Sequence, residues 1–445
     1  MLNIFGSAQS GFCDRQSRRN FIKVGALGMG GLSLPQLLQA EKEAKNGRSH
    51  KAVIMIYLPG GPPHQDMYDL KVDAPSNIRG EFSPISTNVP GIRICEHLPR
   101  MAAMADKLVF VNSLVGSIGQ HASFQCTTGR SSNNQPAGGW PELGTVISRL
   151  QGGKKQTVPN YVNLSPKMKH TPYNFGKNSF VGVGHRAFMP SGETKSDMTL
   201  QGITMERLED RRALLRSFDG LRRNLDATGM MEGLDAFQEE AFDLLTSSRL
   251  LEALDLSKED PKVRERYGKG TTKVQGDAAP RMNEQFLVAR RLVEAGARVV
   301  TVSYSFWDWH GSNFSRAKDN FPDFDRALTA LVDDLHDRGM DEDTTVIAWG
   351  EFGRTPTINE KAGRDHWPRV ANALLACGGM RTGQVIGTTD RLGGEADERP
   401  VHFQEMFATL YHNMGIDINK ATLPDLSGRP QFLVDTEHQP LPEVI

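Results

Sequence analysis

The sequence has few cysteines and no excess of charge of either sign, and each absence excludes a class of protein. Four cysteines in 445 residues are too few for a disulfide scaffold. Lys and Arg number 52 against 53 Asp and Glu, so the chain lacks the basic excess with which proteins bind nucleic acids. Hydrophobic residues make up 38% and charged residues 24%, which is typical of a globular chain and not of a disordered one.

Long apolar runs are also missing, and the longest weakly apolar stretch lies at the N-terminus. Ser17-Arg18-Arg19 precedes the glycine-containing stretch 24–38, and Ala40 stands before charged residues. This stretch is shorter than the roughly 20 apolar residues of a spanning helix, and paired arginines ahead of it are typical of a twin-arginine signal. A surface amphipathic helix is the alternative. We expect 1–40 to be a signal peptide read by the twin-arginine export machinery, and the mature chain to be periplasmic or secreted with no integral membrane segment.

Three cysteines, Cys95, Cys126 and Cys377, would remain after removal of this segment. An odd number argues against an essential disulfide framework, although one pair could form in an oxidising compartment. We expect all three to be buried free thiols.

Short apolar runs bounded by turn residues recur along the mature chain and indicate buried strands. The first, 51–58, is closed by Pro59-Gly60-Gly61-Pro62-Pro63. Similar runs occupy 108–111, 161–164, 299–304, 345–349 and 373–376. Apolar residues at helical spacing precede the runs at 299 and 345, and strand–helix–strand succession is typical of a mostly parallel sheet covered on both faces. The sequence therefore predicts an α/β fold for 41–445.

One region departs from this alternation. Between about residues 200 and 260 the sequence becomes highly charged and keeps a helical pattern. We interpret it as a helical insertion lying beside the sheet domain.

Imidazole and carboxylate side chains follow several of the predicted strands. In chain order they are His64, Asp66, Asp308, His310, Glu351, Asp365 and His366. Ligands bind outside the carboxyl ends of the strands in open α/β sheets, so these loops are expected to meet at one edge. Histidine nitrogens mixed with carboxylate oxygens suit Zn, Mn or Fe better than a cage of oxygens alone. The pattern predicts a site for a divalent metal ion.

Two arginines in the same region leave an alternative open. Arg354 and Arg364 have the geometry to clamp an anionic group with two hydrogen bonds each, in a catalytic and a substrate-binding role respectively. The same guanidinium groups, together with the tryptophans, could instead neutralise the carboxylates in a buried network.

Five motifs along the chain identify a family. They are Gly60-Gly61-Pro62-Pro63-His64-Gln65-Asp66, His121 with Thr128-Gly129-Arg130, Trp307-Asp308-Trp309-His310, Gly350-Glu351-Phe352-Gly353-Arg354-Thr355-Pro356, and Gly363-Arg364-Asp365-His366-Trp367-Pro368. Over residues 51–417 the chain resembles the exported domain-of-unknown-function family 1501, which is related to sulfatases and the alkaline phosphatase superfamily. The resemblance implies an alkaline-phosphatase-like fold and metal-dependent hydrolysis of a phosphate or sulfate ester. It is more specific for a family than for a reaction.

The position of the superfamily's nucleophile differs in this chain. Counting back about ten residues from the Thr-Gly-Arg element reaches Gly119, which has no side chain to attack with, and the sulfatase signature Cys-x-Pro-x-Arg is missing. Ser117 is the nearest alternative nucleophile. The resemblance otherwise implies attack by a metal-activated water, with His121 as a ligand or general base and His366 as the counterpart of the superfamily's late metal histidine.

Two functions follow from these residues. The first is an exported metal-dependent hydrolase acting on an anionic small-molecule or polysaccharide ester. The second is a non-catalytic envelope protein of the same fold that binds a sulfated or phosphorylated polymer. Convergence of the predicted ligands within coordination distance favours the hydrolase, and their separation would remove its basis.

Overall fold

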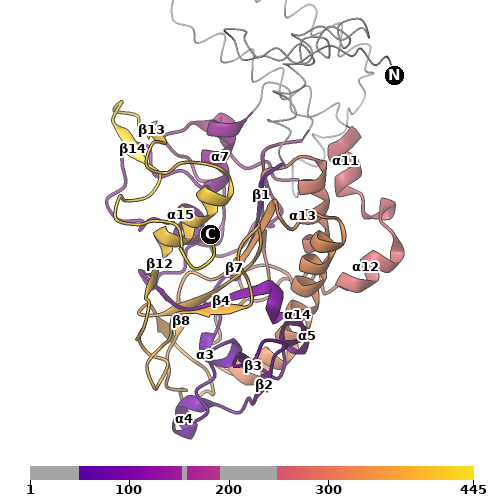
Figure 1. Ribbon diagram of the computed structural model, residues 1–445, viewed down its shortest axis with the longest axis vertical. Helices are drawn as coiled ribbons and strands as arrows, with labels where there is room; N and C mark the ends of the chain where they lie inside the picture. Colours follow the sequence, from indigo (N-terminus) through magenta and orange to yellow (C-terminus); the bar gives the residue numbers. More distant parts are fainter. Residues whose placement is uncertain (1–49, 153–157, 191–247) are drawn as a thin grey trace, which may run out of the picture. The chain divides into compact units, whose positions relative to one another are not determined.

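The computed structural model describes residues 50–152, 158–190 and 248–445 (Figure 1). The expected signal peptide and most of the expected helical insertion lie outside these ranges. The end of the insertion is described and is helical, with α11 (Ser248–Leu254) and a 3₁₀ turn at Leu256–Lys258. Among the described residues, no helix combines the length and the apolar character that crossing a membrane requires.

An eight-stranded sheet forms the centre of the fold, in the order β11-β4-β10-β7-β1-β6-β5 with β12 beside β4 (Figure 1). Its strands are β1 (Ala52–Tyr57), β4 (Leu108–Val115), β5 (Tyr161–Asn163), β6 (Val299–Ser303), β7 (Thr344–Trp349), β10 (Ala371–Cys377), β11 (Gln384–Ile386) and β12 (Val401–His402). All six strands predicted from apolar runs are present, with ends that differ by a few residues. The α/β fold with a mainly parallel sheet is confirmed.

One strand runs against the others. β1 pairs in parallel with β6 and β7, whereas β10 is antiparallel to both β7 and β4. The connection from β7 to β10 contains a short hairpin, β8 (Gly353–Arg354) with β9 (His366–Trp367), where a parallel return would need a crossover helix. β4 consequently points the same way as β1, β6 and β7, so the carboxyl ends of these four strands share one edge.

Alternate residues of the central strand β1 enter two separate cores. Ile54 and Ile56 pack in one core, while Val53 and Met55 pack in the other. The first core also holds residues of α5 (Pro99–Ala103), α11, α12 (Pro261–Tyr267), α13 (Glu284–Ala295) and α14 (Asn313–Asp337). The second holds residues of α6 (Phe124–Thr128), α7 (Leu143–Gln151) and α15 (Phe403–Asn413). Helices therefore cover both faces of the sheet, as predicted.

The remaining elements are short. They are α3 (His64–Met67), α4 (Ser76–Arg79), the hairpins β2 (Pro84–Ser86) with β3 (Arg93–Cys95) and β13 (Thr422–Pro424) with β14 (Pro430–Phe432), and 3₁₀ turns at Ala105–Lys107, Thr171–Tyr173 and Val183–His185. Cys95, Cys126 and Cys377 are buried and form no disulfide, which confirms the prediction of buried free thiols.

Three of the strand-end loops meet at Gly60. Gly60, in the loop after β1, has a φ of +108° and lies so close to the loop after β6 that a Cβ atom would stand 2.4 Å from the Asp308 amide nitrogen. The Gly60 N–H also donates to Glu351 Oε1, in the loop after β7, over 2.9 Å. A glycine is needed here both for the backbone conformation and for the close approach.

We predict that Gly60→Ala is much more destabilising than Gly91→Ala. Gly91 also has a positive φ, +90°, but a Cβ there meets nothing within 4 Å, so its replacement costs only the backbone term of about 1 kcal/mol. The clash at Gly60 should add roughly 1–3 kcal/mol. Urea unfolding of both variants measures the difference, and equal losses would show that the three loops do not need this contact.

Candidate metal centre

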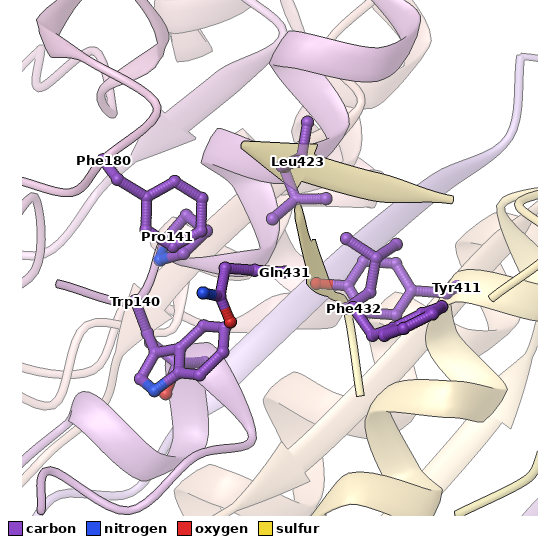
Figure 2. Close-up of a pocket in the computed structure, with 10 residues that line it drawn as sticks. Trp140, Pro141, Phe180, Tyr411, Leu423, Gln431 and Phe432 are labelled. Carbon is purple, nitrogen blue, oxygen red and sulfur yellow. The ribbon is translucent and has the colours of Figure 1, made fainter. Parts of the chain in front are cut away.

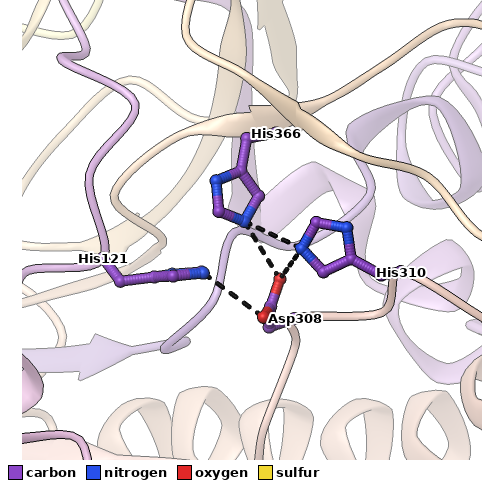
Figure 3. A group of neighbouring side chains, drawn as sticks. All are labelled: His121, Asp308, His310 and His366. Atoms are coloured by element: carbon purple, nitrogen blue, oxygen red, sulfur yellow. Dashed lines mark hydrogen bonds and ion pairs between the residues drawn. The ribbon is translucent and has the colours of Figure 1, made fainter.

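Four side chains from three segments of the chain meet at the carboxyl edge of the sheet (Figure 3). His121 lies between β4 and α6, Asp308 and His310 lie after β6, and His366 begins β9. One potential ligand atom from each residue lies within 4.8 Å of all the others. Three of the predicted metal ligands, Asp308, His310 and His366, therefore lie together with His121 on one rim.

The Asp308 carboxylate is at the centre of the group. Its Oδ1 lies 2.9 Å from His310 Nε2 and 3.2 Å from His366 Nε2, and its Oδ2 lies 3.3 Å from His121 Nε2. The Nε2 atoms of His310 and His366 are 3.0 Å apart. Ligands bound at 2.0–2.1 Å in a tetrahedron are separated by about 3.4 Å, so these spacings suit a small divalent ion.

Two further carboxylates contact the Nδ1 atoms of two of the imidazole rings. Asp365 Oδ1 lies 2.6 Å from His310 Nδ1, and Glu351 Oε1 lies 3.1 Å from His121 Nδ1. A carboxylate at Nδ1 keeps the proton on that nitrogen and turns the Nε2 lone pair toward the opposite side. Both Nε2 atoms are thus prepared to act as metal ligands.

The charges around the group also suit a divalent cation. Arg354 donates to Asp308 Oδ1 over 2.5 Å and its side chain is only 1% exposed. With neutral imidazoles, the carboxylates of Asp308, Glu351 and Asp365 against one guanidinium leave two negative charges, which one divalent ion would balance.

In the metal-free protein, a proton on His121 balances part of this negative charge. Burial lowers the pKa of His121, but hydrogen bonds to Asp308 and Glu351 outweigh it and raise the pKa to about 9. Burial raises the pKa of Asp308, yet hydrogen bonds with His121 and His366 and the charge of Arg354 hold it well below its usual range. His121 is accordingly an imidazolium between two carboxylates in the metal-free protein near neutral pH.

Only three of the seven residues predicted as metal ligands, Asp308, His310 and His366, belong to the group. Glu351 and Asp365 do not, but they contact two of its histidines, His121 and His310 respectively. His64 and Asp66 lie outside the group and have other partners.

His64 is fully buried, and its Nε2 lies 3.0 Å from the carbonyl oxygen of Gly393. Burial lowers the pKa of His64 to about 3, so the ring is neutral. Asp66 forms two hydrogen bonds with Arg364, of 2.7 and 2.8 Å, and both side chains are buried. These residues connect loops beneath the rim. Asp66 and Arg364 form the buried charge network that was the alternative to substrate binding by Arg364.

The predicted catalytic residues differ in their surroundings. His121 is a member of the group. Arg354 is occupied by Asp308 and by the backbone carbonyls of Gly61 and Arg364. Ser117 donates its hydroxyl to the backbone carbonyl of Glu351 over 2.6 Å, so its proton is already engaged with the main chain.

Two contacts to His121 were not foreseen from the sequence. Tyr173 Oη lies 2.8 Å from His121 Nδ1, and His170 Nε2 lies 3.1 Å from the His121 carbonyl oxygen. Both residues belong to the 3₁₀ turn and loop that follow β5. No motif marks them, because the apolar run before them gives no indication that its loop reaches across to the loop after β4.

Solved structures with some similarity to this chain include sulfatases and phosphatases. The PsFucS1 sulfatase from Pseudoalteromonas sp. is 13% identical with a TM-score of 0.36, covering 86% of this chain and 70% of the sulfatase. The phosphonate monoester hydrolase SpPMH from Silicibacter pomeroyi is 11% identical with a TM-score of 0.34, covering 83% and 74%. Alkaline phosphatase from the Antarctic bacterium TAB5 is 11% identical with a TM-score of 0.33, covering 83% and 98%.

Sequence comparison gives a clearer result for the family than for individual relatives. No curated protein matches the chain. A family model described as "Protein of unknown function (DUF1501)" matches residues 50–445, which includes every loop of the candidate metal centre. The chain therefore belongs to the DUF1501 family, as the motifs indicated.

Proposed function

We propose that the protein is an exported, metal-dependent hydrolase of a phosphate or sulfate ester. The observation that carries the proposal is the convergence of His121, Asp308, His310 and His366, whose ligand atoms lie within 4.8 Å of one another. A divalent ion held there would act as a Lewis acid on an ester oxygen and lower the pKa of water toward neutrality.

The other residues of the centre hold protons and charges in place for this chemistry. Asp365 and Glu351 keep protons on the Nδ1 atoms of His310 and His121. Arg354 fixes the Asp308 carboxylate from beneath. The ligand set is thereby oriented before an ion binds, which lowers the cost of binding.

The centre has a buried floor and an accessible rim. The side chains of Glu351 and Arg354 are each 1% exposed, whereas those of His366 and His310 are 30% and 44% exposed. A substrate would therefore approach over the two histidines. Once an ion balances the carboxylates, an anionic ester meets no net repulsion, and the class of ester follows from the motif resemblance.

The attacking group is proposed to be water. The Ser117 hydroxyl is bonded to the Glu351 carbonyl. Counting back about ten residues from Thr128-Gly129-Arg130, where the motif resemblance implies the nucleophile, reaches Gly119. The same observation favours the second candidate function, an envelope protein that binds an anionic polymer without turnover. Tight retention of an anionic polymer without turnover would select this second function, whereas turnover abolished by chelation would exclude it.

We predict that the intact protein binds one or two equivalents of Zn²⁺ or Mn²⁺ and hydrolyses a member of a phosphate and sulfate ester panel. His310→Ala and His366→Ala should each weaken metal binding at least about 100-fold and abolish turnover, since each removes a ligand. His412→Ala, an exposed histidine on α15, is the control and should change neither property. Metal content and calorimetric titration provide the measurements; wild-type affinity in both ligand variants would refute the proposed centre.

The same titration tests the supporting carboxylate. Asp365→Asn should weaken metal binding by about 10–100-fold while leaving all four ligands in place. Asp341→Asn is the matched control, because Asp341 Oδ2 lies 3.0 Å from Nδ1 of His336 in a carboxylate–histidine pair elsewhere. Equal effects of the two substitutions would argue against a specific role of Asp365.

In the metal-free protein, His121 should make stability depend on pH in a defined direction. Its folded pKa of about 9 exceeds the ordinary 6.5, so its stabilisation is complete below pH 6.5 and is lost as the pH rises through about 9. The contribution is up to about 3 kcal/mol. Unfolding free energies of metal-stripped wild type and His121→Gln, measured from pH 6 to 10, should converge at high pH. A constant difference across this range would contradict the charged state of His121.

Export rests on Ser17-Arg18-Arg19 and the stretch that follows it. N-terminal sequencing of the periplasmic protein should find a start near residue 41. Recovery of an intact Met1 from the periplasm would contradict cleavage of a signal peptide.

A further inference from the structure

A second depression lies among residues that the proposed hydrolase chemistry does not use. It is an open groove of about 320 Å³, within the roughly 300–1,000 Å³ of small-molecule sites. Its lining combines the apolar side chains of Trp140, Phe432 and Pro430 with polar and charged side chains. The residues used in the argument are Arg130, Trp140, Gln431, Phe432, Asp435 and Glu437.

The Trp140 ring is held rigidly from one side. The Arg130 guanidinium carbon lies 4.1 Å from the ring centroid, and the Arg130 side chain is only 8% exposed. Its Nη1 is paired with Asp435 and its Nη2 donates to the Phe432 carbonyl over 2.9 Å. A buried, doubly bonded guanidinium fixes the indole as a flat platform while the ring itself stays only half-buried.

Apolar side chains also lie beside the Trp140 ring. A small cavity adjoins the groove and shares Trp140, Gln431 and Phe432 with it (Figure 2). Its other walls include Phe180, whose ring centroid lies 6.0 Å from that of Trp140, and Tyr411. The platform therefore belongs to a packed part of the fold and is not a loose surface ring.

The charges of the groove select the kind of ligand. Arg130 is already neutralised by Asp435, so Glu437, which is exposed, leaves the groove with a negative charge that disfavours anions. A cation stacking on Trp140 would share the π-electrons of the ring with the Arg130 guanidinium, which weakens its attraction to the ring. A neutral ligand with one apolar face and several hydroxyl groups avoids both penalties.

We propose that this groove binds a neutral carbohydrate, with the C–H face of one pyranose ring on Trp140. Gln431, Asp435 and Glu437 carry the amide and carboxylate groups that accept hydrogen bonds from sugar hydroxyls. The groove shares no residue with the candidate metal centre, so sugar binding there requires no metal ion. It would hold a neutral segment of a polymer or a neutral glycan on its own.

Calorimetric titration of the full chain with cellohexaose, maltohexaose, mannohexaose and xylohexaose tests the proposal, with dextran sulfate as the anionic comparison. At least one neutral hexasaccharide should bind. Trp140→Ala should weaken that binding by about tenfold or more, since it removes the platform. Glu437→Ala should weaken it as well, and because Glu437 is exposed this variant keeps the test valid if Trp140→Ala fails to fold.

Two controls separate the groove from other sites. Glu252→Ala, an exposed glutamate on α11, should bind the sugar like wild type. Binding should also be unchanged after chelation, so that failure of the proposed metal centre leaves this result intact. Binding of dextran sulfate alone, loss of sugar binding on chelation, or no binding to any of the four neutral sugars would overturn the proposal.

Discussion

The arrangement of the candidate centre depends on one carboxylate, that of Asp308. Three histidine nitrogens lie between 2.9 and 3.3 Å from its two oxygens, and a buried guanidinium approaches it from below. The backbone at Asp308 packs directly against Gly60, so its position is also fixed by the loop after the central strand. The loops after β1, β4, β6 and β7 therefore meet at this one carboxylate. A divalent ion would bind the carboxylate together with the histidine nitrogens that already surround it.

Buried arginines hold the loops around this point, and their role explains why they are not available to a substrate. Arg354 bonds to the carbonyls of Gly61 and Arg364, and Arg364 in turn bonds to both oxygens of Asp66. Because removal of one member would leave an uncompensated buried charge, such pairs keep the loops in one arrangement. The chain uses Arg364 and Asp66 for rigidity of the rim and places the exposed imidazoles of His310 and His366 where chemistry can occur.

Much of this arrangement could be predicted from the sequence, and what could not has a physical reason. The apolar runs gave the strands, and the rule that ligands lie at the carboxyl ends of strands indicated Asp308, His310 and His366. The same rule also included His64 and Asp66, because sequence position does not reveal that one side chain is fully buried and the other is paired with Arg364. Tyr173 and His170 were missed because their contacts to His121 depend on loop folding that no local pattern encodes.

We propose that His121, Asp308, His310 and His366 bind one metal ion together. Crystals of the full chain soaked in Zn²⁺ and measured at the zinc absorption edge would test it most directly. We expect an anomalous peak between the four side chains, about 2.0–2.1 Å from each histidine nitrogen. No peak at this position, with Asp308 still bonded directly to His121 and Arg354 under saturating zinc, would contradict it.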